Sequence, residues 1–130
     1  MTAHRPPDRP QRILVVDDNR DAADTLGMLL EFLHYEVRTA YDGRQAVGMA
    51  SEFHPDLVIL DINMPVMDGY EAAKTMRSSE TGRERMVLVA LTAVATPEAK
   101  DKAMEAGFDV YLRKPVDGGE LTGLLDRILH

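Results

Sequence analysis

The chain has 130 residues, 45% of them apolar, which is enough for one compact domain with a buried core. Its net charge of −7 argues against sequence-independent binding of nucleic acid, which requires clustered lysine and arginine. Cysteine is absent, which excludes disulfides, and no apolar stretch approaches the ~20 residues that a membrane-spanning helix needs. We therefore expect a cytoplasmic protein that binds neither nucleic acid nor a membrane.

The first residues of the chain differ in composition from the rest. Residues 1–11 combine three prolines with charged neighbours and cannot bury apolar surface, which predicts a disordered leader. From Arg12 onward, short β-branched segments alternate with amphipathic ones, which predicts strand–helix units in one domain at 12–130. The predicted elements are, in chain order, a strand at 13–16, a helix at 22–33, a strand at 35–40, a helix at 44–53, a strand at 57–60, a helix at 68–77, a strand at 86–91, a helix capped by Thr96 and ended by Gly107, a strand at 110–112 and a helix at 121–129.

Local signals support these boundaries and the type of sheet. The spacing of Asp68 and Glu71 permits a capping box, and Thr96 is a favoured N-cap residue. Gly107 accepts the left-handed backbone that often follows a helix. The unbroken apolar strand at 57–60 suits a parallel sheet covered on both faces. Five strand–helix units predict an open α/β three-layer sandwich, because the closed barrel of this type has eight units.

Acidic, hydroxyl and basic side chains follow the predicted strands at one end. These strand-end residues are Asp17, Asp18, Asp61, Thr92 and Lys114. In open parallel sheets, ligands bind beyond the carboxyl ends of the strands. Two carboxylates ~5 Å apart repel by roughly 3 kcal/mol at an effective dielectric constant of ~20, so three would require a cation. Oxygen ligands suit a hard divalent ion, and we predict Mg²⁺ in preference to Ca²⁺.

Each strand-end residue also has an ordinary structural interpretation. Asp17 or Asp18 would cap the first helix, Asp61 would cap a strand end, and Lys114 would be a solvated lysine. Their joint occurrence at the strand ends favours a functional site instead. In such a site, Asp61 is a candidate nucleophile toward phosphorus, and Lys114 and Thr92 are candidate partners for phosphoryl oxygens.

Four motifs resemble the receiver domain of two-component response regulators in their order and separation. They are Asp17-Asp18, the segment 61–69 (DINMPVMDG), Leu91-Thr92-Ala93 and the segment 111–115 (YLRKP). The resemblance covers nearly everything after Arg12. It implies a flavodoxin-like (βα)5 fold with strand order 2-1-3-4-5, in which Asp61 accepts a phosphoryl group from a histidine kinase or a histidine phosphotransfer protein.

The resemblance also implies a role for each residue of the site. The Mg²⁺ ligands would be Asp17, Asp18, Asp61 and the backbone carbonyl of Asn63. The residues that bind the phosphoryl oxygens would be Thr92, Ala93 and Lys114. Thr92 and Tyr111 would form a switch, in which Thr92 moves toward the phosphoryl group and the Tyr111 ring turns into the vacated space, changing the surface offered to a downstream protein. The Lys114–Pro115 peptide bond would be cis.

Two positions qualify this resemblance. His34 stands where the family usually has a glycine that closes the first helix, so we expect some backbone strain there. Val94 occupies a position that influences acyl phosphate hydrolysis in the family, but its effect on the rate does not follow from the sequence.

Other functions fit the motifs less well. An aspartate-nucleophile phosphatase would carry a second aspartate two residues after Asp61, where Asn63 stands, so we expect no enzymatic turnover of external phosphoesters. An inert interaction module would lack one of the strand-end residues, and none is missing. The sequence does not distinguish a stand-alone regulator from the receiver fragment of a hybrid histidine kinase.

Overall fold

The computed structural model describes residues 10–64, 67–78, 86–94 and 96–129. The predicted leader at 1–11 lies outside the described residues, except for its last two. The side-chain amide of Gln11 donates to the carbonyl of Leu129, and the backbone carbonyl of Gln11 accepts from the N–H of Glu36. Within the described ranges, no helix has the length and apolar character needed to cross a membrane.

Strands and helices alternate from Arg12 to Leu129. The strands are β1 (Arg12–Val16), β2 (Glu36–Ala40), β3 (Leu57–Asp61), β4 (Val87–Thr92) and β5 (Val110–Arg113). The helices are α1 (Arg20–Phe32), α2 (Gly43–Phe53), α3 (Gly69–Ser78), α4 (Pro97–Ala106) and α5 (Gly118–Leu129). All neighbouring strands are parallel, in the order β2-β1-β3-β4-β5. The predicted flavodoxin-like fold is confirmed.

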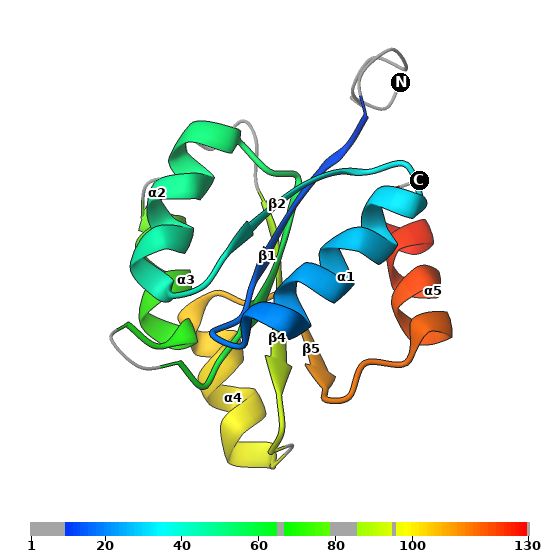
Figure 1. Cartoon of the computed structure of the whole chain (residues 1–130). Helices are drawn as coiled ribbons and strands as arrows, with labels where there is room; N and C mark the ends of the chain where they lie inside the picture. Colours follow the sequence, from blue (N-terminus) through cyan, green and yellow to red (C-terminus); the bar gives the residue numbers. More distant parts are fainter. Residues whose placement is uncertain (1–9, 65–66, 79–85, 95, 130) are drawn as a thin grey trace, which may run out of the picture.

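The sheet lies between two layers of helices, with α1 and α5 on one face and α2, α3 and α4 on the other (Figure 1). Successive side chains of β1 alternate between the two cores, because Cβ atoms alternate across a strand. Ile13 and Val15 pack in the core beneath α1 and α5, whereas Leu14 and Val16 pack in the other. Every residue of β3 is buried, which explains the unbroken apolar segment at 57–60.

Two helices begin earlier than the sequence pattern predicts. α1 begins at Arg20 because the side chain of Asn19 accepts from a backbone N–H of the first turn. The interpretation of Asp17 or Asp18 as the cap of this helix is therefore wrong. α5 begins at Gly118 and not at residue 121, since Asp117 accepts from a first-turn N–H in the same way. Glycines in that turn hide the helix start from a propensity argument.

Other helix ends agree with the sequence signals. Asp68 Oδ1 accepts from the N–H three residues later, which is half of the predicted capping box. Thr96 caps α4, and Gly107 ends it with φ of 110°. His34 has φ of 75°, the left-handed conformation expected where the family has glycine. His54, at the end of α2, also has a positive φ of 54°.

Arg77 joins the end of α3 to the amino-terminal ends of β4 and β5. Its guanidinium donates from Nε to the carbonyl of Gly107 at 2.9 Å, and from Nη1 to that of Met86 at 2.6 Å. It also forms an ion pair with Asp109, whose carboxylate accepts from the N–H of Leu88. One side chain thus fastens three segments at the edge of the sheet away from the acidic cluster.

We expect Arg77→Leu to lower the free energy of unfolding by about 2–4 kcal/mol, because it removes the cationic partner of a partly buried carboxylate and one donor from each of two carbonyls. Urea unfolding followed by circular dichroism measures this loss. Arg127→Leu is the matched control on the exposed side of α5, with an expected change within about 0.5 kcal/mol. Equal stabilities of the two variants would contradict the role given to Arg77.

Candidate functional site

Four parallel strands bring polar side chains to one edge of the sheet, at the lower end of the molecule in Figure 1. Asp17 follows β1, Asp61 ends β3, Thr92 ends β4, and Lys114 follows β5. The edge is the one at which open α/β sheets bind ligands. The residues that the sequence singled out therefore share one region of the fold.

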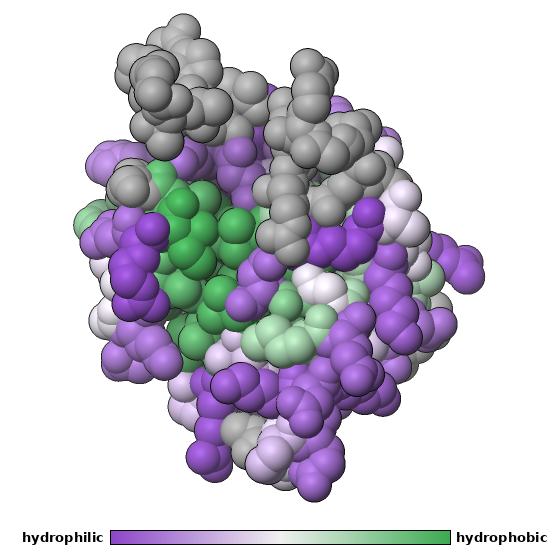
Figure 2. All heavy atoms as spheres, turned by 180° about the vertical axis from the view of Figure 1, so that it is seen from behind, coloured by the Kyte–Doolittle hydropathy of each residue, from purple (hydrophilic) through white to green (hydrophobic). Residues whose placement is uncertain are grey.

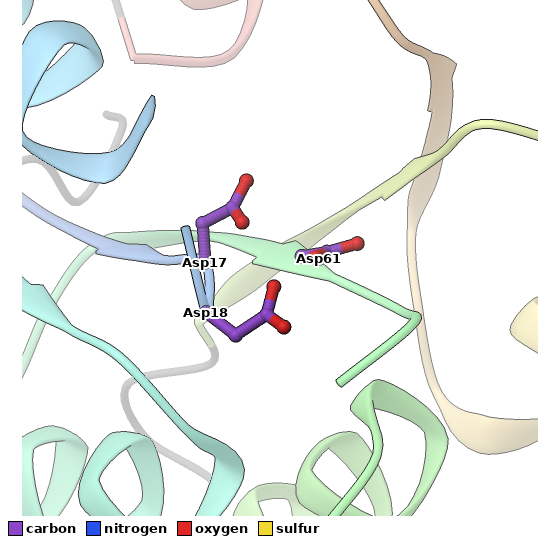
Figure 3. Close-up of side chains that lie close together, drawn as sticks. All are labelled: Asp17, Asp18 and Asp61. Atoms are coloured by element: carbon purple, nitrogen blue, oxygen red, sulfur yellow. The ribbon is translucent and has the colours of Figure 1, made fainter. Parts of the chain in front are cut away.

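Three carboxylates lie together at this edge (Figure 3). Asp17, Asp18 and Asp61 each offer one oxygen, and these oxygens lie within 4.8 Å of one another. Asp17 and Asp61 are only 5% and 3% exposed, whereas Asp18 is exposed to solvent. Neighbouring buried carboxylates repel strongly unless positive charge compensates them.

Lys114 supplies part of that positive charge. Its Nζ lies 3.0 Å from Asp17 Oδ2 and 3.4 Å from Asp61 Oδ2. Burial lowers the pKa of Lys114, but the hydrogen bond to Asp17 and the charges of both carboxylates outweigh this effect and raise its pKa overall. The ammonium group therefore stays charged. The peptide bond from Lys114 to Pro115 is cis.

Asp61 is the carboxylate whose protonation is most altered. The pKa of Asp61 is raised to about 6, chiefly by burial. The charge of Lys114 and the N–H of Asn63 lower this pKa, whereas the charge of Asp17 raises it. This N–H donates to Asp61 Oδ1 at 3.2 Å. The net rise in spite of the Lys114 ion pair therefore comes first from burial of the carboxylate and only then from the charge of Asp17.

Two glycines that the sequence argument did not use position the loop after β3. A Cβ on Gly69 would lie 2.7 Å from the carbonyl oxygen of Asp61 and 2.6 Å from the Cα of Ile62, so only glycine fits. A Cβ on Gly43, at the start of α2, would collide with the carbonyl of Met67. The clue to Gly69 was its place in the segment 61–69, whereas nothing in the local pattern marks Gly43.

Thr92 and Tyr111 share one hydrogen-bond acceptor. Thr92 Oγ1 donates to the carbonyl of Val94 at 2.9 Å and accepts from the N–H of the same residue at 3.1 Å. The hydroxyl of Tyr111 donates to the same carbonyl at 2.7 Å. Thr92 is buried, while Ala93 and Val94 are exposed. In this conformation the threonine hydroxyl thus bonds within its own loop and not to the acidic cluster.

The acidic cluster fits a hard divalent cation. Its donors are all oxygens and lie within 4.8 Å of one another, close to the ~4.2 Å between opposite ligands of one Mg²⁺ ion, so small side-chain adjustments bring them to one ion. Three carboxylates against one ammonium group leave a net negative charge for the ion to offset. Among the predicted ligands, Asn63 lies two residues beyond Asp61 and is exposed.

The model of the response regulator receiver domain family matches residues 13–126. The chain belongs to this family. The response regulator MprA of Mycolicibacterium vanbaalenii is 40% identical to it over 121 residues, which are 93% of this chain and 51% of that protein. The chain thus spans about half the length of this curated relative. Receiver domains are signalling domains of two-component systems, and the family resemblance expected from the motifs is confirmed.

Solved structures with the same fold include chemotaxis protein CheY4 of Vibrio cholerae, with 33% identity and a TM-score of 0.85 over 92% of this chain and 99% of that one. The receiver domain of the sensor histidine kinase PA1611 of Pseudomonas aeruginosa, 37% identical, has a TM-score of 0.82 over 92% and 98% of the two chains. That structure holds a magnesium ion coordinated in the active site cleft. The receiver domain of Saccharomyces cerevisiae Ssk1, solved with the histidine phosphotransfer protein Ypd1, is 29% identical with a TM-score of 0.84 over 93% and 90%.

The pKa of Asp61 predicts how stability depends on pH without metal. Its pKa is about 6 in the folded state, against 3.8 ordinarily, so the folded state binds more protons, and stability falls as pH rises from about 4 to 6. We expect Asp61→Asn to raise the free energy of unfolding by about 1–2 kcal/mol at pH 7.5, allowing for solvent screening, and to lose this advantage near pH 4.

Urea unfolding in EDTA at both pH values measures the effect. Asp101→Asn, which removes an exposed carboxylate from α4, is the control and should show no such pH-dependent gain. If Asp61→Asn were no more stable than the parent at pH 7.5, ionised Asp61 would not be a destabilising charge.

Proposed function

We propose that this domain is a phosphorylation-controlled switch in which Asp61 accepts a phosphoryl group from a histidine kinase or a histidine phosphotransfer protein. One observation carries the proposal: a buried aspartate at a strand end lies beside two further carboxylates and within 3.4 Å of a lysine ammonium group. A nucleophile toward phosphorus needs this combination of exclusion from bulk water and nearby positive charge.

In the proposed transfer, one carboxylate oxygen of Asp61 forms a bond to the phosphorus of the donor phosphohistidine. The phosphorus–nitrogen bond breaks as the new bond forms, and its electron pair leaves with the imidazole nitrogen. The ammonium group of Lys114, which pairs with Asp17 and Asp61 before the transfer, would also form an ion pair with a phosphoryl oxygen. The proposed metal ligands are Asp17, Asp18, Asp61 and the carbonyl of Asn63. When bound, Mg²⁺ would neutralise charge on the phosphoryl oxygens.

The shared carbonyl of Val94 suggests how phosphorylation would change the surface. If Thr92 Oγ1 turns toward a phosphoryl oxygen, it gives up its bond to Val94, and the same carbonyl is the acceptor for Tyr111. Ala93, an exposed residue between Thr92 and Val94, would complete the phosphoryl-binding loop. The segment that leads into α4 would then rearrange, which offers a downstream protein a different surface.

A second candidate function has the same phosphotransfer chemistry but places the domain in a larger protein. In this candidate the domain serves a hybrid histidine kinase, a context supported by the 37% identity to the receiver domain of the sensor kinase PA1611. A phosphatase is disfavoured because Asn63, which has no acidic proton to give, stands where that class carries its general acid.

Incubation with acetyl phosphate and Mg²⁺, followed by intact mass measurement, tests the chemistry directly. We expect one acid-labile phosphoryl group on the parent chain, dependent on the metal and absent from Asp61→Asn. Asp101→Asn, with its exposed carboxylate on α4, is the matched control and should be labelled like the parent. Equal labelling of Asp61→Asn would refute Asp61 as the acceptor.

Exposed apolar side chains on α1 support docking of a donor protein near the site. Met28 and Phe32 lie one helical turn apart and are 68% and 78% exposed, and Leu29 beside them is 40% exposed. α1 begins three residues after Asp17, and these side chains lie 8 to 12 residues further along it, about 12–18 Å at 1.5 Å per residue, so a partner helix must lie along the whole of α1 to reach both this patch and the acidic edge. Spacing of this kind fits the apolar face of a partner helix. We propose that the histidine donor binds here.

Phe32→Ser tests this docking surface separately from the chemistry. Phosphotransfer is measured from the purified histidine kinase that labels the parent chain fastest. We expect a rate about tenfold or more lower, as for loss of a central apolar anchor, with unchanged labelling by acetyl phosphate. Met104→Ser removes an exposed apolar side chain from α4 and should have little effect. Unchanged phosphotransfer by Phe32→Ser would rule out this part of α1 as the docking surface.

A further inference from the structure

Helix α4 is attached to the domain by little apolar surface. Within α4, all of which the structure describes, the buried side chains are those of Ala103 and Ala106, whereas α5 buries three leucines. Hydrophilic residues dominate the lower end of the molecule, where α4 lies, in the view from behind (Figure 2). Helices with so few buried apolar contacts belong to the less stable parts of a fold. The remaining contacts therefore have a large influence on where α4 sits.

Tyr70 provides such a contact from the neighbouring helix α3 (Figure 1). The Nζ of Lys102, on α4, lies 4.4 Å from the centre of the Tyr70 ring. The hydroxyl of Tyr70 donates to the carbonyl of Ala99, in the first turn of α4, at 3.5 Å. The ring also packs against the core on this face of the sheet. One aromatic side chain thus touches both of the first two turns of α4.

The backbone beside Tyr70 is in direct contact with that of Asp61. Gly69 donates its N–H to the carbonyl of Ile62 at 2.9 Å, and its lack of a side chain lets α3 pack against the Asp61 carbonyl. No room remains between the two backbones for even one added carbon. A displacement of the Asp61 backbone is therefore passed to the first turn of α3, and Tyr70 carries it toward α4.

We propose that Tyr70 is a positioning residue that couples the state of Asp61 to helix α4 through contacts with Ala99 and Lys102, which differ from the contacts of Thr92 and Tyr111 with Val94. The inference rests on the proposed phosphorylation of Asp61. Tyr111 acts on the segment before α4 through the carbonyl of Val94, whereas Tyr70 holds α4 itself through Ala99 and Lys102. Two aromatic contacts on different parts of a weakly attached helix would together set its position.

Hydrogen exchange read by mass spectrometry over residues 97–106, with and without acetyl phosphate and Mg²⁺, tests this route. We expect Tyr70→Leu to take up the phosphoryl group like the parent but to show a phosphorylation-induced change in α4 exchange smaller by about threefold or more. Tyr70→Phe keeps the ring over Lys102 and should retain most of the response. A purely structural role would alter exchange equally in both states.

Lys102→Met tests the same contact from the exposed side of α4, without altering the core. It should reduce the response in the same direction, whereas Lys100→Met removes an equal charge two residues away and should not. In a Tyr111→Phe background, Tyr70→Leu should reduce the response further, as expected for separate routes.

The outcomes separate the inference from the proposed function. Normal phosphorylation of Tyr70→Leu and Lys102→Met with an undiminished α4 response would overturn the role of Tyr70 and leave the function intact. An absent additional effect in the Tyr111→Phe background would overturn the separate route. Failure of the parent chain itself to take up a phosphoryl group would overturn the proposed function and this inference with it.

Discussion

The ion pairs of Lys114 with Asp17 and Asp61 are the interactions on which the site depends. Three carboxylates at one edge of a sheet would repel one another, and two of them are buried. The ammonium group, 3.0 and 3.4 Å away, allows this arrangement, yet the pKa of Asp61 is still raised to about 6. Burial is the main cause of that rise, and three carboxylates beside one ammonium group still leave net negative charge at the site. Residual negative charge around a reactive carboxylate favours binding of a divalent cation. A bound cation in turn offsets the repulsion between the carboxylates and the oxygens of a phosphoryl group.

Backbone packing gives this electrostatic arrangement its geometry. The loop after β3 is confined by Gly43 on one side and Gly69 on the other, since a Cβ at either position would collide with backbone atoms. Confinement of this kind keeps Asp61 and Asn63 in place although the loop is short and partly exposed. It also means that the loop cannot shift alone, because close-packed elements transmit displacement to their neighbours.

Helix α4 is the element best placed to respond to such a displacement. Its two buried alanines bind it less firmly than the leucines bind α5. Tyr111 reaches the residue two positions before its cap, and Tyr70 reaches its first two turns. Firm attachment of the sheet and loose attachment of one helix together suit a domain that stays folded while it changes the surface it presents.

Several features followed from the sequence because they depend on short-range physics. Alternating apolar periodicities predicted the strand–helix units, Thr96 and Gly107 predicted both ends of α4, and the strand-end positions of Asp17, Asp61 and Lys114 predicted one shared edge. The starts of α1 and α5, which Asn19 and Asp117 cap, were missed, because several adjacent polar residues could have capped α1 and because two glycines open α5.

The sequence by itself determined the order of the elements, the parallel sheet and the residue types at its edge, because periodicity and strand ends are local properties. Only the tertiary structure decided which side chains touch. The contact of Lys114 with Asp17 spans 97 positions of sequence, and the close approach of Gly43 to Met67 joins the start of α2 to the loop after β3. Such contacts arise from the packing of helices across the sheet, which no local pattern specifies. The burial of Asp61 and the contacts of Tyr70 with α4 have the same origin.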